Sequence, residues 1–116
     1  MEISTDQLAK MIAANADDKK AENILVLDMR GITTLADYFV LCNGTSSTQV
    51  QAIVRSIEDG LAEEDIKPIR KEGLDSYQWV VLDYADVMVH VFDQEQREYY
   101  DLEKLWGDAD QIDWRN

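Results

Sequence analysis

The fold is decided by two short runs of sequence, Tyr77–Asp83 (YQWVVLD) and Asp86–Phe92 (DVMVHVF). Both runs are rich in β-branched and aromatic residues, which is typical of strands. So few residues separate them that a β-hairpin is the natural connection. We therefore expect two antiparallel strands here, with side chains alternating between the two faces of the hairpin.

The two faces of this hairpin differ in chemistry. One face is uniformly aliphatic and is the better candidate for the core; its residues are Val80, Leu82, Val87, Val89 and Val91. If Asp83 pairs with Asp86, the other face pairs Val81 with Met88, Trp79 with His90 and Tyr77 with Phe92. Aromatic, adaptable and acidic groups mixed in this way are typical of protein interfaces. The alternative is that a C-terminal helix covers this second face.

Outward from the hairpin, the chain shows helix and strand signals in turn. Capping boxes at Ser4 with Gln7 and at Ser46 with Gln49 predict the starts of two helices. The predicted helices end near Asp17 and Glu64, and a C-terminal helix is expected to start after Asp93. Strands are predicted over residues 24–29, 38–42 and 66–72, the last at a sheet edge because Pro68 cannot donate to a ladder.

The order of these elements predicts one α/β domain, a mixed sheet of about five strands packed with helices. Nothing in the composition divides the chain into two domains. We expect residues 1–108 to form this domain and residues 109–116 to form an acidic, frayed tail.

The charge of the chain excludes some classes of partner. Its 116 residues carry a formal net charge of −13, and the C-terminal 45 residues hold twelve acidic but only three basic side chains. Because nucleic-acid affinity comes largely from lysine and arginine, direct binding to nucleic acid or to an anionic membrane is disfavoured. A solvated acidic surface and a site for a basic protein both fit this charge.

The sequence offers no catalytic or metal centre. Cys42 is the only cysteine and His90 the only histidine, so neither a disulfide nor a cysteine-rich zinc site forms within the chain. The start of the sequence lacks the basic and apolar regions of a secretory signal. We expect a cytoplasmic protein with no cofactor, in which Cys42 is a buried thiol and His90 a packed or interface residue.

One glycine-rich turn needs separate consideration. Gly44–Ser47 precedes a helix and is similar to the phosphate-binding turn of nucleotidyltransferases. Those enzymes also need two or three carboxylates that converge on magnesium. The following strand carries Lys67 and Arg70 but no carboxylate until Glu72, so we expect Ser46 to cap the helix.

Several blocks of residues together resemble the ribosomal silencing factor family, also called Iojap-like. The blocks are Asp28, Ala36–Val40, Gly44–Ser47, Glu72–Gly73, Trp79, Asp83–Phe92 and Tyr100–Trp106. The resemblance runs from about Thr5 to Asp108. One departure is Ala85, where the family usually has glycine; Tyr84 and Ala85 fit a tight two-residue turn poorly, which indicates a wider loop.

The resemblance implies a domain with a nucleotidyltransferase-like scaffold that lacks the catalytic carboxylates. It also implies a translational repressor that binds a basic protein of the large ribosomal subunit, the fourteenth (uL14-type), and prevents the small subunit from joining. On this basis the partner-binding residues are expected to be Trp79, Val81, Asp83, Tyr84, Asp86, Met88, His90 and Glu103. The alternatives are a catalytically degenerate nucleotide-binding protein and a structural homodimer that buries the same hairpin face.

Overall fold

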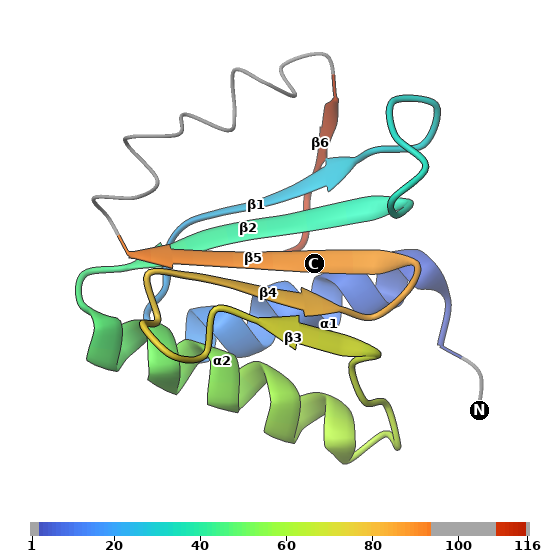
Figure 1. Ribbon diagram of the computed structural model, residues 1–116. Helices are drawn as coiled ribbons and strands as arrows, with labels where there is room; N and C mark the ends of the chain where they lie inside the picture. The colour runs from blue at the N-terminus through green and yellow to red at the C-terminus, as the bar shows by residue number, and fades with distance from the viewer. Residues whose placement is uncertain (1–2, 94–108, 116) are drawn as a thin grey trace.

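The computed structural model describes residues 3–93 and 109–115, which contain two helices and six strands (Figure 1). In chain order the elements are α1 (Thr5–Asp18), β1 (Glu22–Asp28), β2 (Tyr38–Gly44), α2 (Ser47–Ala62), β3 (Arg70–Glu72), β4 (Trp79–Asp83), β5 (Val87–Asp93) and β6 (Asp110–Ile112). The predicted α/β class and single mixed sheet are confirmed. The sequence analysis expected about five strands, and the sixth is β6.

The six strands form one sheet in the order β3-β4-β5-β2-β1-β6. The central pair, β2 and β5, is parallel, and the other pairs are antiparallel. Both described helices lie on one side of this sheet (Figure 1). The sheet therefore has a helix face, which α1 and α2 cover, and an opposite face, called the open face below.

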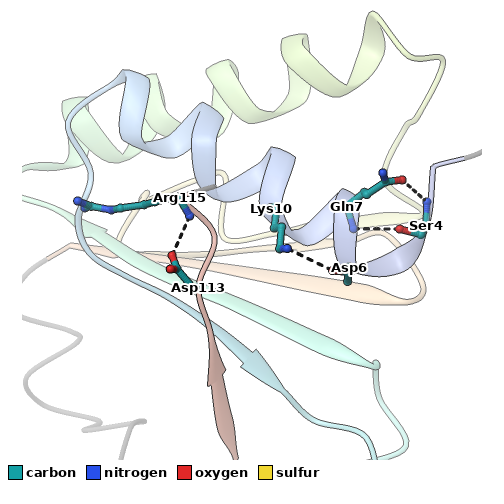
Figure 2. Close-up of polar contacts among 6 residues, drawn as sticks. All are labelled: Ser4, Asp6, Gln7, Lys10, Asp113 and Arg115. Atoms are coloured by element: carbon teal, nitrogen blue, oxygen red, sulfur yellow. Dashed lines mark hydrogen bonds and ion pairs between the residues drawn. The ribbon is translucent and has the colours of Figure 1, made fainter.

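Helix α1 begins as predicted. The Ser4 hydroxyl accepts from the Gln7 amide at 3.3 Å, and the Gln7 side chain accepts from the Ser4 amide at 3.0 Å (Figure 2). This reciprocal pair satisfies two N–H groups that a helix start would otherwise leave without a partner. One turn further on, Lys10 and Asp6 form an exposed i,i+4 ion pair at 3.4 Å.

Helix α2 begins with only half of its predicted capping box. Ser46 accepts from the Gln49 amide at 3.1 Å, as expected. The Gln49 side chain does not return to Ser46: its oxygen accepts from the Thr45 amide at 2.7 Å, and its nitrogen donates to the carbonyl oxygens of Lys19 and Lys20. Gln49 therefore ties the start of α2 to the turn that leads into β1.

The main core lies between the sheet and the two helices. All five aliphatic residues predicted for the core face of the hairpin are fully buried in it; they are Val80, Leu82, Val87, Val89 and Val91. Ile53, Ile57 and Leu61 of α2 pack against them from the helix side. Cys42 is buried in the same cluster, as predicted.

The hairpin register differs from the predicted one by two residues. Asp83 pairs with Met88 and Trp79 with Phe92, whereas the sequence analysis paired Asp83 with Asp86 and Trp79 with His90. The reason is a wider loop: four residues, 84–87, separate the paired Asp83 and Met88 where the prediction had two, and the Tyr84 amide donates to the Val87 carbonyl at 2.9 Å. Because side chains alternate with a period of two, this shift changes each partner but leaves the side chains of β4 and β5 on their predicted faces. Tyr77 is the exception: it precedes β4 and packs against the main core, not on the face predicted for it.

Ala85 occupies a strained position in this turn. Its φ is +70°, and the Asp86 amide donates to the Tyr84 carbonyl at 2.9 Å, which closes a γ-turn around Ala85. A residue with a Cβ is disfavoured at such a φ, and glycine is not. We expect Ala85→Gly to raise the free energy of unfolding by about 1 kcal/mol. Urea denaturation measures this change, and an equal or lower stability of the variant would contradict the assigned turn.

The two edge strands depart most from the predicted boundaries. β3 is an edge strand as expected, but it covers only Arg70–Glu72 because Pro68 interrupts the predicted run. β6 lies within the segment expected to be a frayed tail, and Ile112 pairs with Val26 of β1. After β6, the Arg115 amide donates to the Asp113 carboxylate at 3.1 Å (Figure 2). The predicted C-terminal helix falls on residues 94–108, outside the described residues.

Candidate functional site

The open face of the sheet carries a second apolar cluster, separate from the main core. Its buried members are Leu27, Met29, Ala36, Phe39, Leu41, Met88 and Phe92, with Trp79, Val81, Leu25 and Ala109 packed against them and partly exposed. These residues come from β1, β2, β4 and β5, together with the β1–β2 connection and the residue before β6. The predicted interface face of the hairpin forms one part of this cluster.

Four rings gather at the centre of the open face. Trp79 lies against Phe92 with ring centroids 5.1 Å apart, and His90 is stacked on Phe92 at 6.1 Å with an interplanar angle of 10°. Phe39 of β2 lies 5.0 Å from His90. The Trp79 Nε1–H donates to His90 Nδ1 at 3.1 Å. Packing on Phe92 and the bond to His90 thus fix the indole of Trp79 in one orientation on the sheet.

His90 is a buried, uncharged imidazole in this arrangement. Its side chain is only 5% exposed, and burial lowers its pKa to about 4. Because Nδ1 accepts the hydrogen bond from Trp79, the single ring proton of the neutral form is on Nε2. His90 therefore serves as an acceptor that orients Trp79, which is the packed role that the sequence analysis weighed for it.

The pKa of His90 predicts a pH dependence of stability. Its pKa is lower in the folded protein than in the unfolded chain, where it is about 6.5, so below that pH the unfolded state takes up a proton that the folded state does not. His90 is therefore expected to lower the free energy of unfolding by about 2 kcal/mol as the pH falls from 7 to 5. Urea denaturation of the wild type and of His90→Asn, which keeps an acceptor for Trp79, measures the difference. If the free energy of unfolding fell equally with pH in both proteins, the assignment of this pH dependence to His90 would be contradicted.

The segment before Trp79 has an unusual backbone. Gly73 has φ +84°, and a Cβ placed there would overlap the carbonyl oxygen of Trp79. Tyr77 has φ +55°, uncommon for an aromatic residue, and its amide donates to the Gly73 carbonyl at 3.1 Å. The Asp93 amide donates to the Gln78 carbonyl at 2.9 Å. A close, strained connection therefore fixes the position where Trp79 enters β4.

Acidic side chains lie where the hairpin turns. Asp83 is half-buried and pairs with Arg70 of β3 at 3.3 Å, and it also accepts from the Ala85 amide at 2.9 Å. Asp86 is exposed at the tip of the turn. Among the described residues Asp86 is in no ion pair, so its charge is available to a partner.

The predicted site residues are not equally accessible. Trp79, Val81 and Asp83 are half-exposed and lie on the open face. Met88 lies on the same face but is only 8% exposed. Tyr84 is buried on the helix face, where burial and the charge of Glu58 raise the pKa of its phenol above the ordinary value. Glu103 lies outside the described residues.

The connection between β1 and β2 also contributes to this side of the molecule. Beside the polar Thr33 and Thr34, this connection exposes two aliphatic side chains: Ile32 is 43% exposed and Leu35 61% exposed. A sequence signal for this part of the site was present: two aliphatic residues lie in a short connection that also holds Gly31 and two threonines. The candidate site is therefore larger than the hairpin face alone.

The Gly44–Ser47 turn has the geometry of a helix cap. The Ser46 hydroxyl caps α2, and Thr45 bonds to Gln49 through both its amide and its hydroxyl. Within the described ranges, no three His, Cys, Asp or Glu side chains come together in a way that would hold a metal ion. The site offers apolar contact, rigid aromatic surface and negative charge, which are means of recognition.

A groove of about 310 Å³ lies elsewhere, between α2 and the residues around β3. Its lining includes Arg55 and Lys71, but also Glu58 and Asp59. Lys71 is already bonded to Glu58 at 3.1 Å. This balance of charges does not favour a polyphosphate. Neither of the two described helices is long and apolar enough to cross a lipid bilayer.

Comparison with known proteins assigns this fold and these motifs to one family. Residues 2–116 match the family described as ribosomal silencing factor during starvation. The ribosomal silencing factor RsfS of Bacillus subtilis is 54% identical over 102 residues, which cover 88% of this chain and 86% of that protein.

Two solved structures show the same fold. A crystal structure from Chromobacterium violaceum has a TM-score of 0.87 and 31% identity, and the match covers 98% of this chain and 94% of the other. One from Bacillus halodurans has a TM-score of 0.81 and 40% identity, covering 92% and 97% of the two chains. This protein therefore belongs to the ribosomal silencing factor family.

Proposed function

We propose that this protein represses translation by binding the large ribosomal subunit and sterically preventing the small subunit from joining. The observation that carries the proposal is the match to the ribosomal silencing factor family over residues 2–116. As the docking point we propose a basic protein of the large subunit, the fourteenth (uL14-type). The cytoplasm is the compartment where such a partner is met.

Two properties support a basic protein as the partner: the negative charge of the chain and the rigid aromatic surface of the open face. A net charge of −13 opposes docking on ribosomal RNA but favours docking on a lysine- and arginine-rich protein. Trp79 is half-exposed and held by His90 and Phe92, so binding need not immobilise a free side chain. Large, fixed aromatic groups of this kind commonly carry much of the binding energy of an interface.

We assign the predicted residues distinct roles in this interface. Trp79 and Val81 make apolar contact, and Met88 lies beneath them. Asp83 and Asp86 face basic side chains, with Asp86 the more accessible charge. His90 orients Trp79, and Tyr84 is buried in the core behind the turn. Glu103, outside the described residues, is proposed as a further acidic contact for the partner.

The proposed role needs neither catalysis nor a cofactor. A nucleotide-binding function would call on the Gly44–Ser47 turn, where Ser46 and Gln49 are already engaged in capping. A homodimer through the open face is the other alternative. Sedimentation of the free protein separates monomer from dimer, and incubation with nucleoside triphosphates and magnesium detects any turnover.

Co-sedimentation with purified large subunits, and separately with assembled ribosomes, tests the proposal. We expect binding to free large subunits and little binding to assembled ribosomes, where the joined small subunit blocks the site. Equal binding to both particles would contradict steric exclusion. Absence of binding to large subunits would contradict the proposed function itself.

A further inference from the structure

The described residues expose three large aliphatic side chains, and two of them share one short connection. Ile32 is 43% exposed and Leu35 is 61% exposed, both between β1 and β2; the third, Ile69 at 71%, precedes β3. Single exposed aliphatic residues are common on protein surfaces. Ile32 and Leu35 instead form a pair of exposed aliphatic side chains on one short loop.

The β1–β2 loop, residues 29–37, is anchored at both ends. Met29 and Ala36 are buried in the open-face cluster. The Met29 amide donates to the Asp37 carbonyl at 2.8 Å and closes the loop, and the Ile32 amide donates to the Met29 carbonyl at 3.0 Å. With its inner residues already packed and its backbone bonded, the loop presents Ile32 and Leu35 outward at little further entropic cost.

The same loop is joined to the tip of the hairpin. The amides of Asp37 and Tyr38 both donate to the Asp86 carbonyl, at 2.9 and 3.2 Å. Figure 1 shows the β1–β2 loop and the β4–β5 turn at the same end of the sheet. The loop is therefore continuous with the acidic turn that belongs to the proposed interface.

The free charge of this surface is negative. Asp37 and Asp86 are both exposed, and neither forms an ion pair within the part of the chain that the structure describes. Arg30, the basic residue of the loop, is bonded through two nitrogens to the carboxylate of Asp28, at 2.9 and 2.7 Å. Two aliphatic side chains beside two unpaired carboxylates fit a basic protein surface with an apolar depression.

We infer that the β1–β2 loop is a second contact for the basic partner, in which Ile32 and Leu35 enter an apolar depression while Asp37 and Asp86 face lysine or arginine side chains. This inference rests on the proposed function. It extends the interface from Trp79 on the open face around the end of the sheet. The loop also has a hollow, lined by Gly31, Ile32, Thr33 and Thr34, in which a side chain of the partner would fit.

The test is kinetic binding to immobilised, purified large ribosomal subunits. The double variant Ile32→Ser, Leu35→Ser removes the aliphatic contact, and we expect about tenfold weaker binding, mainly through faster dissociation. The matched control is Ile69→Ser, which loses an even more exposed isoleucine. Ile69 directly precedes β3, where Lys71 faces Glu58 of α2, and by alternation Ile69 lies on that helix side. We expect it to bind like the wild type.

A second arm tests the charges. Asp37→Asn is expected to slow association at low salt and to reduce its salt dependence, with little change in dissociation. Circular dichroism and thermal unfolding establish that each variant is folded; the substituted side chains are exposed, so the fold should persist.

The outcomes separate this inference from the proposed function. If the wild-type protein binds and the Ile32→Ser, Leu35→Ser variant binds with the same rate constants, the inference is overturned and the proposed function stands. An equal loss in the Ile69→Ser control would overturn it as well, because the effect would not be specific to the loop. Failure of the wild type to bind would refute the proposed function and this inference together.

Discussion

Trp79→Ala is expected to weaken binding to the large-subunit protein about 30-fold, mainly by speeding dissociation. The substitution removes the largest partly exposed side chain of the open face and leaves the acceptor on His90 without its donor. Truncation of such a central anchor commonly costs 2 kcal/mol or more of binding free energy. Surface plasmon resonance on the immobilised ribosomal protein measures both rate constants.

Trp114→Ala is the matched control for this variant. Trp114 is also a half-buried tryptophan, but it packs against the main core on the helix face. It should lose comparable apolar burial, and hence comparable stability, without a change in binding. Thermal unfolding confirms that both variants are folded before binding is compared. Wild-type kinetics in a folded Trp79→Ala protein would remove the open face from the proposed site.

The second large effect concerns stability. Gly73→Ala is expected to lower the free energy of unfolding by about 3 kcal/mol, because a Cβ at that position overlaps the backbone of Trp79 and the residue has φ +84°. The overlap is with a carbonyl oxygen, which can move only if β4 moves as well. Binding should fall together with stability, since the displaced residue is Trp79.

Gly31→Ala isolates the contribution of the overlap. Gly31 has nearly the same φ, +83°, but a Cβ there meets no atom within 4 Å. We expect a loss of only about 1 kcal/mol, from the backbone conformation alone. Urea denaturation of the two variants compares them directly. Equal losses would show that the contact between Gly73 and Trp79 is unimportant.

The sequence predicted most of the fold because its strongest signals are local. Alternation along the strands places Val80, Leu82 and Val89 on the opposite face from Trp79, Met88 and His90, and a register error of two residues cannot reverse that assignment. The register itself depends on the turn, and the γ-turn at Ala85 runs against the φ preference of alanine. Local sequence could therefore indicate a wider loop but could not give its pairing.

Other features depend on contacts that a local pattern does not contain. β6 is three residues long, Asp110–Ile112, and forms because Ile112 meets Val26 across the sheet edge. The burial of Tyr84 and the meeting of the β1–β2 loop with Asp86 likewise join residues far apart in sequence. For this reason the candidate site was predicted as a hairpin face and not as a surface that turns around the end of the sheet.

The central claim, that this protein keeps the two ribosomal subunits apart, is tested most directly by light scattering during subunit association. Purified large subunits are incubated with the protein and then mixed with small subunits, with Trp79→Ala as the matched weak binder. We predict that saturating wild-type protein lowers both the rate and the extent of association, and that Trp79→Ala needs about 30-fold more protein for the same effect. Unchanged association at saturating wild-type protein would contradict the account.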